Sequence, residues 1–232
     1  MSSIELRPDE LPVRDVYRLL TGVIVPRPVA WITTLSPTGA VNLAPFSAFT
    51  LVSPSPPMVG FTVGPAKDTC RHVEARQEFV VNIPSFTHVD DVHDSSIEHP
   101  PEISELDELG LTTVASSRIT TPRLAGTAIQ LECEVRAIHH HGNFATRFVV
   151  GEIVAFHIDA ELLLRNSGGI AVDVVGLDPI GVLTGGQYSR LGDITSRQPA
   201  HGARNPWGMS YPERATAGPP DPTAVDGIVA AT

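Results

Sequence analysis

The chain has 232 residues, of which 42% are hydrophobic and 18% charged, so its composition is that of a globular protein and excludes global disorder. Its length predicts one domain with appendages. The formal net charge of −10 argues against nucleic acid and anionic membranes as partners, because both repel an acidic surface.

The N-terminal third of the chain predicts one helix and four strands. Apolar side chains at positions 13, 16, 17 and 20 have the spacing of an amphipathic helix, and Gly22 is expected to end it. Residues 25–34 and 41–44 are rich in strand-forming side chains around the turn sequence 36–39, which predicts a β-hairpin. Two more strands are expected at 49–53 and 58–63, separated by prolines that favour a turn or a sheet edge.

The middle of the chain adds a second helix and a second hairpin. A helix is expected over 70–77, capped by Asp68 or Thr69 and followed by a strand at 79–83. The polar stretch 85–101 predicts a short helix and loop, and residues 106–111 predict a helical turn. The two longest strand patterns, 129–138 and 147–158, are expected to pair across a loop at 139–143. Six or seven strands with few helices favour a barrel or sandwich.

The segment around residue 67 has the composition of an anion site. Lys67 is the only lysine among 16 basic residues, and it stands just before the expected helix. The first amides of a helix are unpaired and its dipole favours negative charge, so Lys67, Thr69 and Arg71 could hold a phosphate. The alternative is an ordinary capped helix with a solvated lysine.

Residues 42–49 have small, amide and hydroxyl side chains where a packed strand would have large ones. Such a stretch suits a backbone that lies close to a flat polar ligand, for instance an isoalloxazine ring, with Pro45 and Phe46 shaping the contact. A bulged strand followed by a turn would explain the same composition.

Several sequence strings, in order and spacing, resemble the flavin reductase-like FMN-binding split barrels, a family that includes NAD(P)H:flavin oxidoreductases and flavoredoxin. The resemblance covers roughly residues 10–193. The matching strings are Arg27-Pro28-Val29-Ala30-Trp31-Ile32-Thr33-Thr34, Asn42-Leu43-Ala44-Pro45-Phe46-Ser47, Pro56-Pro57, Lys67-Asp68-Thr69, Glu78-Phe79-Val80-Val81-Asn82 and Gly151-Glu152-Ile153-Val154.

The resemblance implies a mainly β, split-barrel domain over 1–193 with a few short flanking helices, followed by a Pro/Gly-rich tail over 194–232. It also implies a homodimer that binds FMN, or FAD, near the subunit interface. The residues that it implies for cofactor binding are Thr33, Thr34, Asn42, Ala44, Pro45 and Phe46 around the ring, Ser47, Lys67, Asp68 and Thr69 toward the phosphate, and Arg27 and Pro28 at the groove mouth. The sequence departs from the family pattern at 181–188, so contacts from that segment are not expected.

Histidines offer one candidate for catalysis and none for a metal. His157 follows the Gly151 string, in a region that faces the nicotinamide in similar reductases, and it is a candidate for orienting that cofactor; a packed strand histidine is the alternative. The run His139-His140-His141 is expected to form a hairpin loop, because neighbours in an extended backbone point to opposite faces. We therefore expect no metal.

The resulting hypothesis is a flavin reductase in which hydride passes from NADH or NADPH to FMN, and which supplies reduced flavin to a separate monooxygenase. Three alternatives remain open: an FMN-holding oxidoreductase that acts directly on a small organic substrate, a flavoredoxin-like electron-transfer protein, and a barrel that binds no flavin. Two cysteines are too few for a disulfide scaffold, and the first residues lack a signal-peptide pattern, so a cytoplasmic location is expected.

Overall fold

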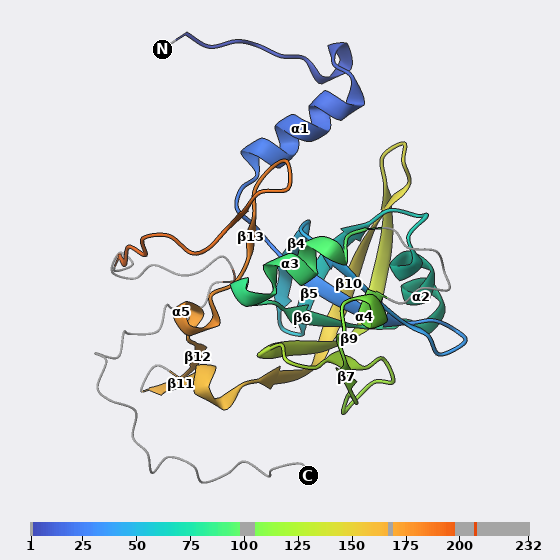
Figure 1. The fold of residues 1–232 in the computed structure, drawn as a ribbon. Coiled ribbons are helices and arrows are strands. Elements are labelled where there is room, and N and C mark those ends of the chain that lie inside the picture. Colours follow the sequence, from blue (N-terminus) through green and yellow to red (C-terminus); the bar gives the residue numbers. More distant parts are fainter. Residues whose placement is uncertain (1, 98–104, 167–168, 198–206, 208–232) are drawn as a thin grey trace.

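A computed structural model describes residues 2–97, 105–166, 169–197 and 207 (Figure 1). Its centre is one seven-stranded sheet in the order β3-β2-β6-β9-β10-β5-β4, with every neighbouring pair antiparallel. The sheet curls without closing, so the protein is a split barrel, as its sequence predicts. Within the described residues, no helix is both long and apolar enough to cross a membrane.

The strands of the main sheet are β2 (Ala30–Leu35), β3 (Val41–Phe46), β4 (Phe49–Pro54), β5 (Pro57–Val63), β6 (Glu78–Ile83), β9 (Ile129–His141) and β10 (Thr146–Ile158). The helices are α1 (Val13–Val23), α2 (Asp68–Arg76), α3 (Val89–Asp94), α4 (Glu105–Glu108) and α5 (Val174–Leu177), with 3-10 turns η1 (Pro8–Glu10), η2 (Phe86–His88) and η3 (Ala160–Leu162). Small outer sheets contain β1 (Arg27–Pro28), β7 (Thr113–Val114), β8 (Arg123–Leu124), β11 (Leu163–Asn166), β12 (Gly169–Val172), β13 (Gly181–Val182) and β14 (Tyr188–Ser189).

Both expected hairpins are confirmed, with three differences at their ends and at the helices. Helix α1 continues through Gly22 to Val23, since an isolated glycine weakens a helix without having to end it. Helix α2 begins at Asp68, and its N-cap is Lys67 in an extended conformation rather than Asp68 or Thr69. Residues 139–141 belong to β9, because the ladder to β10 continues to the His141–Thr146 pair. Most of the tail predicted from residue 194 lies outside the described residues.

Alternation along β2 divides the interior into two clusters. Ile32 packs inside the barrel with Phe61 and Phe79, whose rings meet nearly edge to face at 5.2 Å. Trp31 points to the other face of the sheet and packs with Leu124 in a second cluster that includes α3. β2 is therefore apolar on both faces, which fixes its register, and its neighbour β3 is one of the two edge strands of the sheet, with β4 at the opposite edge.

Gly151 of β10 permits close packing against the barrel core. A Cβ atom at this position would lie 2.5 Å from Cζ of Phe79 and 3.2 Å from Cβ of Cys133. We expect Gly151→Ala to lower the free energy of unfolding by about 1–3 kcal/mol, because the buried ring would have to shift. Urea unfolding followed by circular dichroism measures this. Gly22→Ala is the control, since a Cβ there meets nothing within 4 Å; equal losses in both variants would contradict the packing argument.

Candidate flavin site

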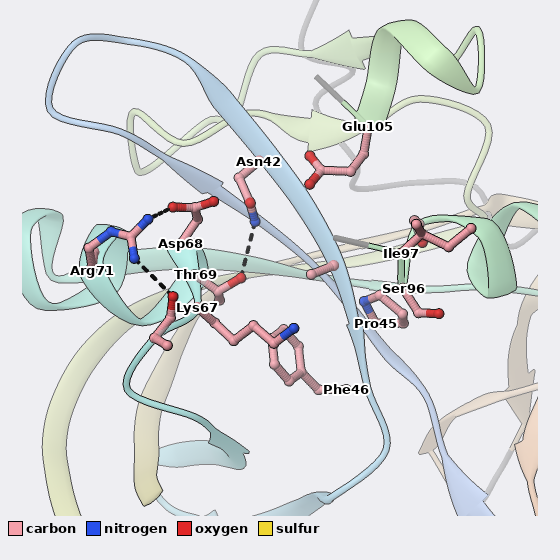
Figure 2. Close-up of a pocket in the computed structure, with 13 residues that line it drawn as sticks. Asn42, Pro45, Phe46, Lys67, Asp68, Thr69, Arg71, Ser96, Ile97 and Glu105 are labelled. Carbon is pink, nitrogen blue, oxygen red and sulfur yellow. Dashed lines mark hydrogen bonds and ion pairs between the residues drawn. The ribbon is translucent and has the colours of Figure 1, made fainter. Parts of the chain in front are cut away.

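A cavity of about 320 Å³ opens between the edge strand β3, the start of α2, the residues directly after α3 and the start of α4 (Figure 2). This volume is within the range of small-molecule sites, roughly 300–1,000 Å³. Its lining residues are Asn42, Ala44, Pro45, Phe46, Ala66, Lys67, Asp68, Thr69, Arg71, Ser95, Ser96, Ile97 and Glu105. Seven of the predicted cofactor-binding residues are therefore brought together: Asn42, Ala44, Pro45, Phe46, Lys67, Asp68 and Thr69.

The first turn of α2 presents hydrogen-bond donors to this cavity. The intrahelical bonds begin at the amides of Cys70 and Arg71, which both donate to the carbonyl oxygen of Lys67, so the amides of Asp68 and Thr69 precede the ladder. The side-chain amide of Asn42 donates to the Thr69 hydroxyl over 3.0 Å (Figure 2). Because the Thr69 oxygen accepts in that bond, the hydroxyl keeps its proton for donation.

Charges of both signs line the cavity. Arg71 forms an ion pair with Asp68 and donates to the carbonyl oxygen of Ala66 over 2.9 Å, so this turn of the helix is nearly neutral (Figure 2). Lys67 is exposed at the helix start and adds positive charge, whereas Glu105 enters from α4 with negative charge. An anionic group would therefore be favoured at the α2 side of the cavity, where the helix dipole adds to the lysine charge.

The wall opposite α2 was not predicted from sequence. Ser95, Ser96 and Ile97 follow α3, and the indole N–H of Trp31 donates to the Ser95 hydroxyl over 2.9 Å. Ser95 is thereby tied to the second apolar cluster, and Glu105 lies beyond a gap in the described chain. In the sequence these residues are distinguished only by their polar surroundings. Their place in the cavity wall depends on long-range contacts with β2 and β3, which a local pattern does not show.

Two predicted ring contacts, Thr33 and Thr34, lie outside the cavity lining. The hydroxyl of Thr33 donates to the carbonyl oxygen of Pro122 over 2.7 Å, and the hydroxyl of Thr34 is 3.2 Å from Nδ1 of His72. Both threonines are fully buried. Burial, and then the nearby arginines Arg71 and Arg76, lower the pKa of His72, which favours its neutral ring in this contact.

Arg27, Pro28 and Ser47 also lie outside the lining. The guanidinium of Arg27 donates to three carbonyl oxygens, those of Thr21 (2.7 Å), Ile24 (2.7 Å) and Leu183 (2.6 Å). Its Nε donates to the hydroxyl of Ser47 over 3.3 Å, and Pro28 is exposed opposite Gly181 of β13. Arg27 thus ties the end of α1 and the β13–β14 turn to the turn after β3, just beyond the cavity.

His157 is not among the residues that line the cavity, and it lies near the C-terminal end of β10. Its Nε2 is 2.5 Å from the carboxylate of Glu132, which is fully buried in β9. The amides of Ser117 and Arg118 also donate to this carboxylate, over 2.7 and 2.6 Å. Burial raises the pKa of Glu132, but these hydrogen bonds outweigh burial and leave it below its ordinary value.

Comparison with known families identifies the family to which this fold belongs. The model of the flavin reductase-like domain matches residues 22–170, which include β2, β3, the start of α2 and His157. The chain belongs to the flavin reductase-like family. A protein of Halalkalibacterium halodurans, described only as uncharacterized, is 38% identical over 202 residues, which are 83% of this chain and 95% of the relative.

Two solved structures extend the likeness of this flavin reductase-like protein. Nitrilotriacetate monooxygenase component B from Bacillus cereus superposes with a TM-score of 0.80 at 31% identity, over 85% of this chain and all of the other. The 2-nitrobenzoate 2-nitroreductase of Pseudomonas fluorescens superposes with a TM-score of 0.78 at 28% identity, over 88% of this chain and all of the other.

Proposed function

We propose that the cavity between β3 and α2 binds FMN and that the protein is an NAD(P)H-dependent flavin reductase. The observation that carries the proposal is the convergence of Asn42, Lys67 and Thr69 at a helix start inside the segment that the family model matches. A phosphate needs several donors and positive charge in one place, and this end of the cavity provides both.

The chain's own residues would bind and orient the cofactor. Lys67, the first amides of α2 and the Thr69 hydroxyl would hold the phosphate. Pro45 and Phe46 would face the flavin ring system, and the Phe46 ring packs against the ring of Phe61 at a centroid distance of 5.1 Å. The chemistry that flavin supplies when bound is two-electron transfer from a reduced nicotinamide. FAD is the alternative ligand that the family resemblance implies.

The nicotinamide contact of His157 stays a prediction. Its Nε2 is already held by Glu132, so the contact would use the rest of the ring or a surface that a second subunit completes.

Stopped-flow absorbance with each nucleotide tests the proposed reaction. Purified protein mixed with FMN and either NADH or NADPH should bleach the flavin band under anaerobic conditions, many times faster than the same mixture without protein. If the flavin bleaches no faster with protein than without it for both nucleotides, the proposed flavin reductase activity is refuted.

Two proposals follow for the fate of the electrons. The likeness to a monooxygenase component favours a supplier of reduced flavin to a separate monooxygenase. The likeness to a nitroreductase favours the alternative, direct reduction of a small organic substrate on held FMN. Gel filtration discriminates between them: flavin that leaves the protein upon reduction supports the supplier, and flavin that stays bound in both states supports direct reduction.

We also propose that the protein is a homodimer. Val13, Tyr17 and Leu20 lie on one face of α1, and they are 62%, 66% and 52% exposed. Helix α1 extends away from the sheet and contains no buried residue (Figure 1). An apolar stripe of this kind on a soluble protein is typical of an interface, and a second copy of the chain would cover it.

Charge on the α1 stripe should break this dimer. We expect the double variant Tyr17→Glu, Leu20→Glu to elute as a monomer of 24.8 kDa in gel filtration with light scattering, while the wild type elutes at twice that mass. The variant Arg14→Glu, Arg18→Glu alters the charge of α1 but leaves the apolar stripe and is the control. A wild-type monomer, or loss of the dimer in the control alone, would contradict the interface.

A further inference from the structure

Three histidines in succession end strand β9 and play no part in the proposed flavin site. The structure continues the β9–β10 ladder through them, pairing His139 with Phe148, His140 with Arg147 and His141 with Thr146. The end of this long hairpin rises beyond the rest of the sheet (yellow in Figure 1). All three histidines are exposed there.

Their strand conformation sorts the three side chains onto two faces. Side chains two positions apart in a strand share a face, so His139 and His141 lie together and His140 points to the opposite face. The rings of His139 and His141 have centroids 6.4 Å apart with planes at 39°. Because pairing with β10 continues through all three histidines, the backbone keeps the two imidazoles near each other before any ligand binds.

This spacing is close to that of two imidazoles on one metal ion. Imidazole nitrogen binds Zn²⁺ at about 2.0–2.1 Å, which puts each ring centroid about 3.2 Å from the ion and the two centroids about 5–6 Å apart. The observed separation of 6.4 Å is slightly larger than that range, and small rotations of the two exposed side chains would close the difference. Within the described residues, no group of three or more His, Cys, Asp or Glu side chains is arranged for a metal, so water would complete the coordination.

We propose that His139 and His141 form a two-ligand surface site for a late first-row divalent metal ion, with Cu²⁺ bound most tightly. Imidazole suits copper, nickel and zinc, and among these divalent ions affinity is highest for copper. The proposed metal site is separate from the flavin cavity. His140 is the control residue, because it has the same imidazole side chain but points to the opposite face of β9.

Titration of the full-length protein with Cu²⁺ tests the site, with the dissociation constant measured by equilibrium dialysis and the bound ion examined by electron paramagnetic resonance. The wild type should bind one Cu²⁺ with two nitrogen donors. His139→Ala and His141→Ala should each weaken that binding by roughly tenfold or more and remove one nitrogen donor from the spectrum, whereas His140→Ala should leave both within about twofold.

The same titration can overturn the proposal. If all three alanine variants bind Cu²⁺ as the wild type does, the ion sits elsewhere on the chain. Equal weakening in His140→Ala and His139→Ala would also contradict it, since the same-face geometry would then be irrelevant. Circular dichroism spectra that match the wild type confirm that each variant is folded.

Discussion

Replacing Lys67 with alanine should weaken FMN binding by roughly ten- to hundredfold, because a hydrogen bond to a charged group contributes about 1.5–3 kcal/mol. Lys67 stands at the N-cap of α2 and lines the cavity beside the Thr69 hydroxyl. Riboflavin has the same ring system without the phosphate, so its affinity should barely change. Quenching of flavin fluorescence during titration with protein measures both ligands under identical conditions.

The control for that loss is Arg136→Ala, which removes the same positive charge from an exposed site on β9. Arg136 pairs with Glu134 and Glu152, on the sheet surface outside the cavity lining. Its replacement should leave FMN affinity unchanged at moderate ionic strength, where distant surface charges are screened. Equal losses in the two variants would mean that net charge, rather than a phosphate contact, controls the affinity.

Replacing Glu132 with alanine should lower the free energy of unfolding by about 3–5 kcal/mol, the cost typical of removing one partner from a buried ionic network. The Glu132 carboxylate accepts hydrogen bonds from the amides of Ser117 and Arg118 and contacts His157, and Arg123 lies 3.8 Å away. Without it these donors are left in a buried setting. Because 1 kcal/mol shifts the melting temperature of a chain of this size by roughly 2–4 °C, calorimetry should show a drop of about 6–20 °C.

Glu134→Ala provides the comparison on the same strand, two residues away. Its carboxylate is half-exposed and pairs with Arg136, so its loss should cost less than about 1 kcal/mol. Similar melting temperatures for the Glu132 and Glu134 variants would contradict the buried network.

The same carboxylate sets part of the acid stability. The pKa of Glu132 lies below its ordinary value in the folded protein, so its contribution is present above the unfolded pKa of about 4.3 and is lost as pH falls through the folded pKa. Glu78 behaves alike: burial raises its pKa, but hydrogen bonds from Thr120 and Thr121 outweigh burial and lower it. The stability difference between wild type and Glu132→Ala should therefore shrink only below about pH 4. A difference that already shrinks between pH 8 and 6 would contradict this assignment.

Local pattern predicts most of the strands because their side chains alternate or form continuous apolar runs. The Thr34–Asn42 pairing, for example, follows from turn residues 36–39 between two strand patterns. The end of β9 is longer than predicted, since cross-strand pairing to β10 overrides the weak strand preference of consecutive histidines. The order and composition of side chains along β9 alone do not reveal how far its pairing with β10 continues.

The residues of the candidate site could likewise be predicted only in part from the sequence. Asn42, Lys67 and Thr69 could be predicted because each belongs to a short string with its own chemistry. Ser96 and Glu105 could not, since they reach the cavity through the packing of α3 and α4 against β3. Arg27 illustrates the opposite case: a charged residue in a family string whose guanidinium, in this structure, ties three carbonyl oxygens together.

Titration of the wild-type protein with FMN and, in parallel, with riboflavin tests whether the α2 end of the cavity holds flavin by its phosphate, as we propose. We expect saturable quenching of flavin fluorescence for both ligands, with FMN bound at least about tenfold more tightly because of the charge-assisted phosphate contact. Equal affinities for the two flavins, or no quenching with FMN, would contradict it.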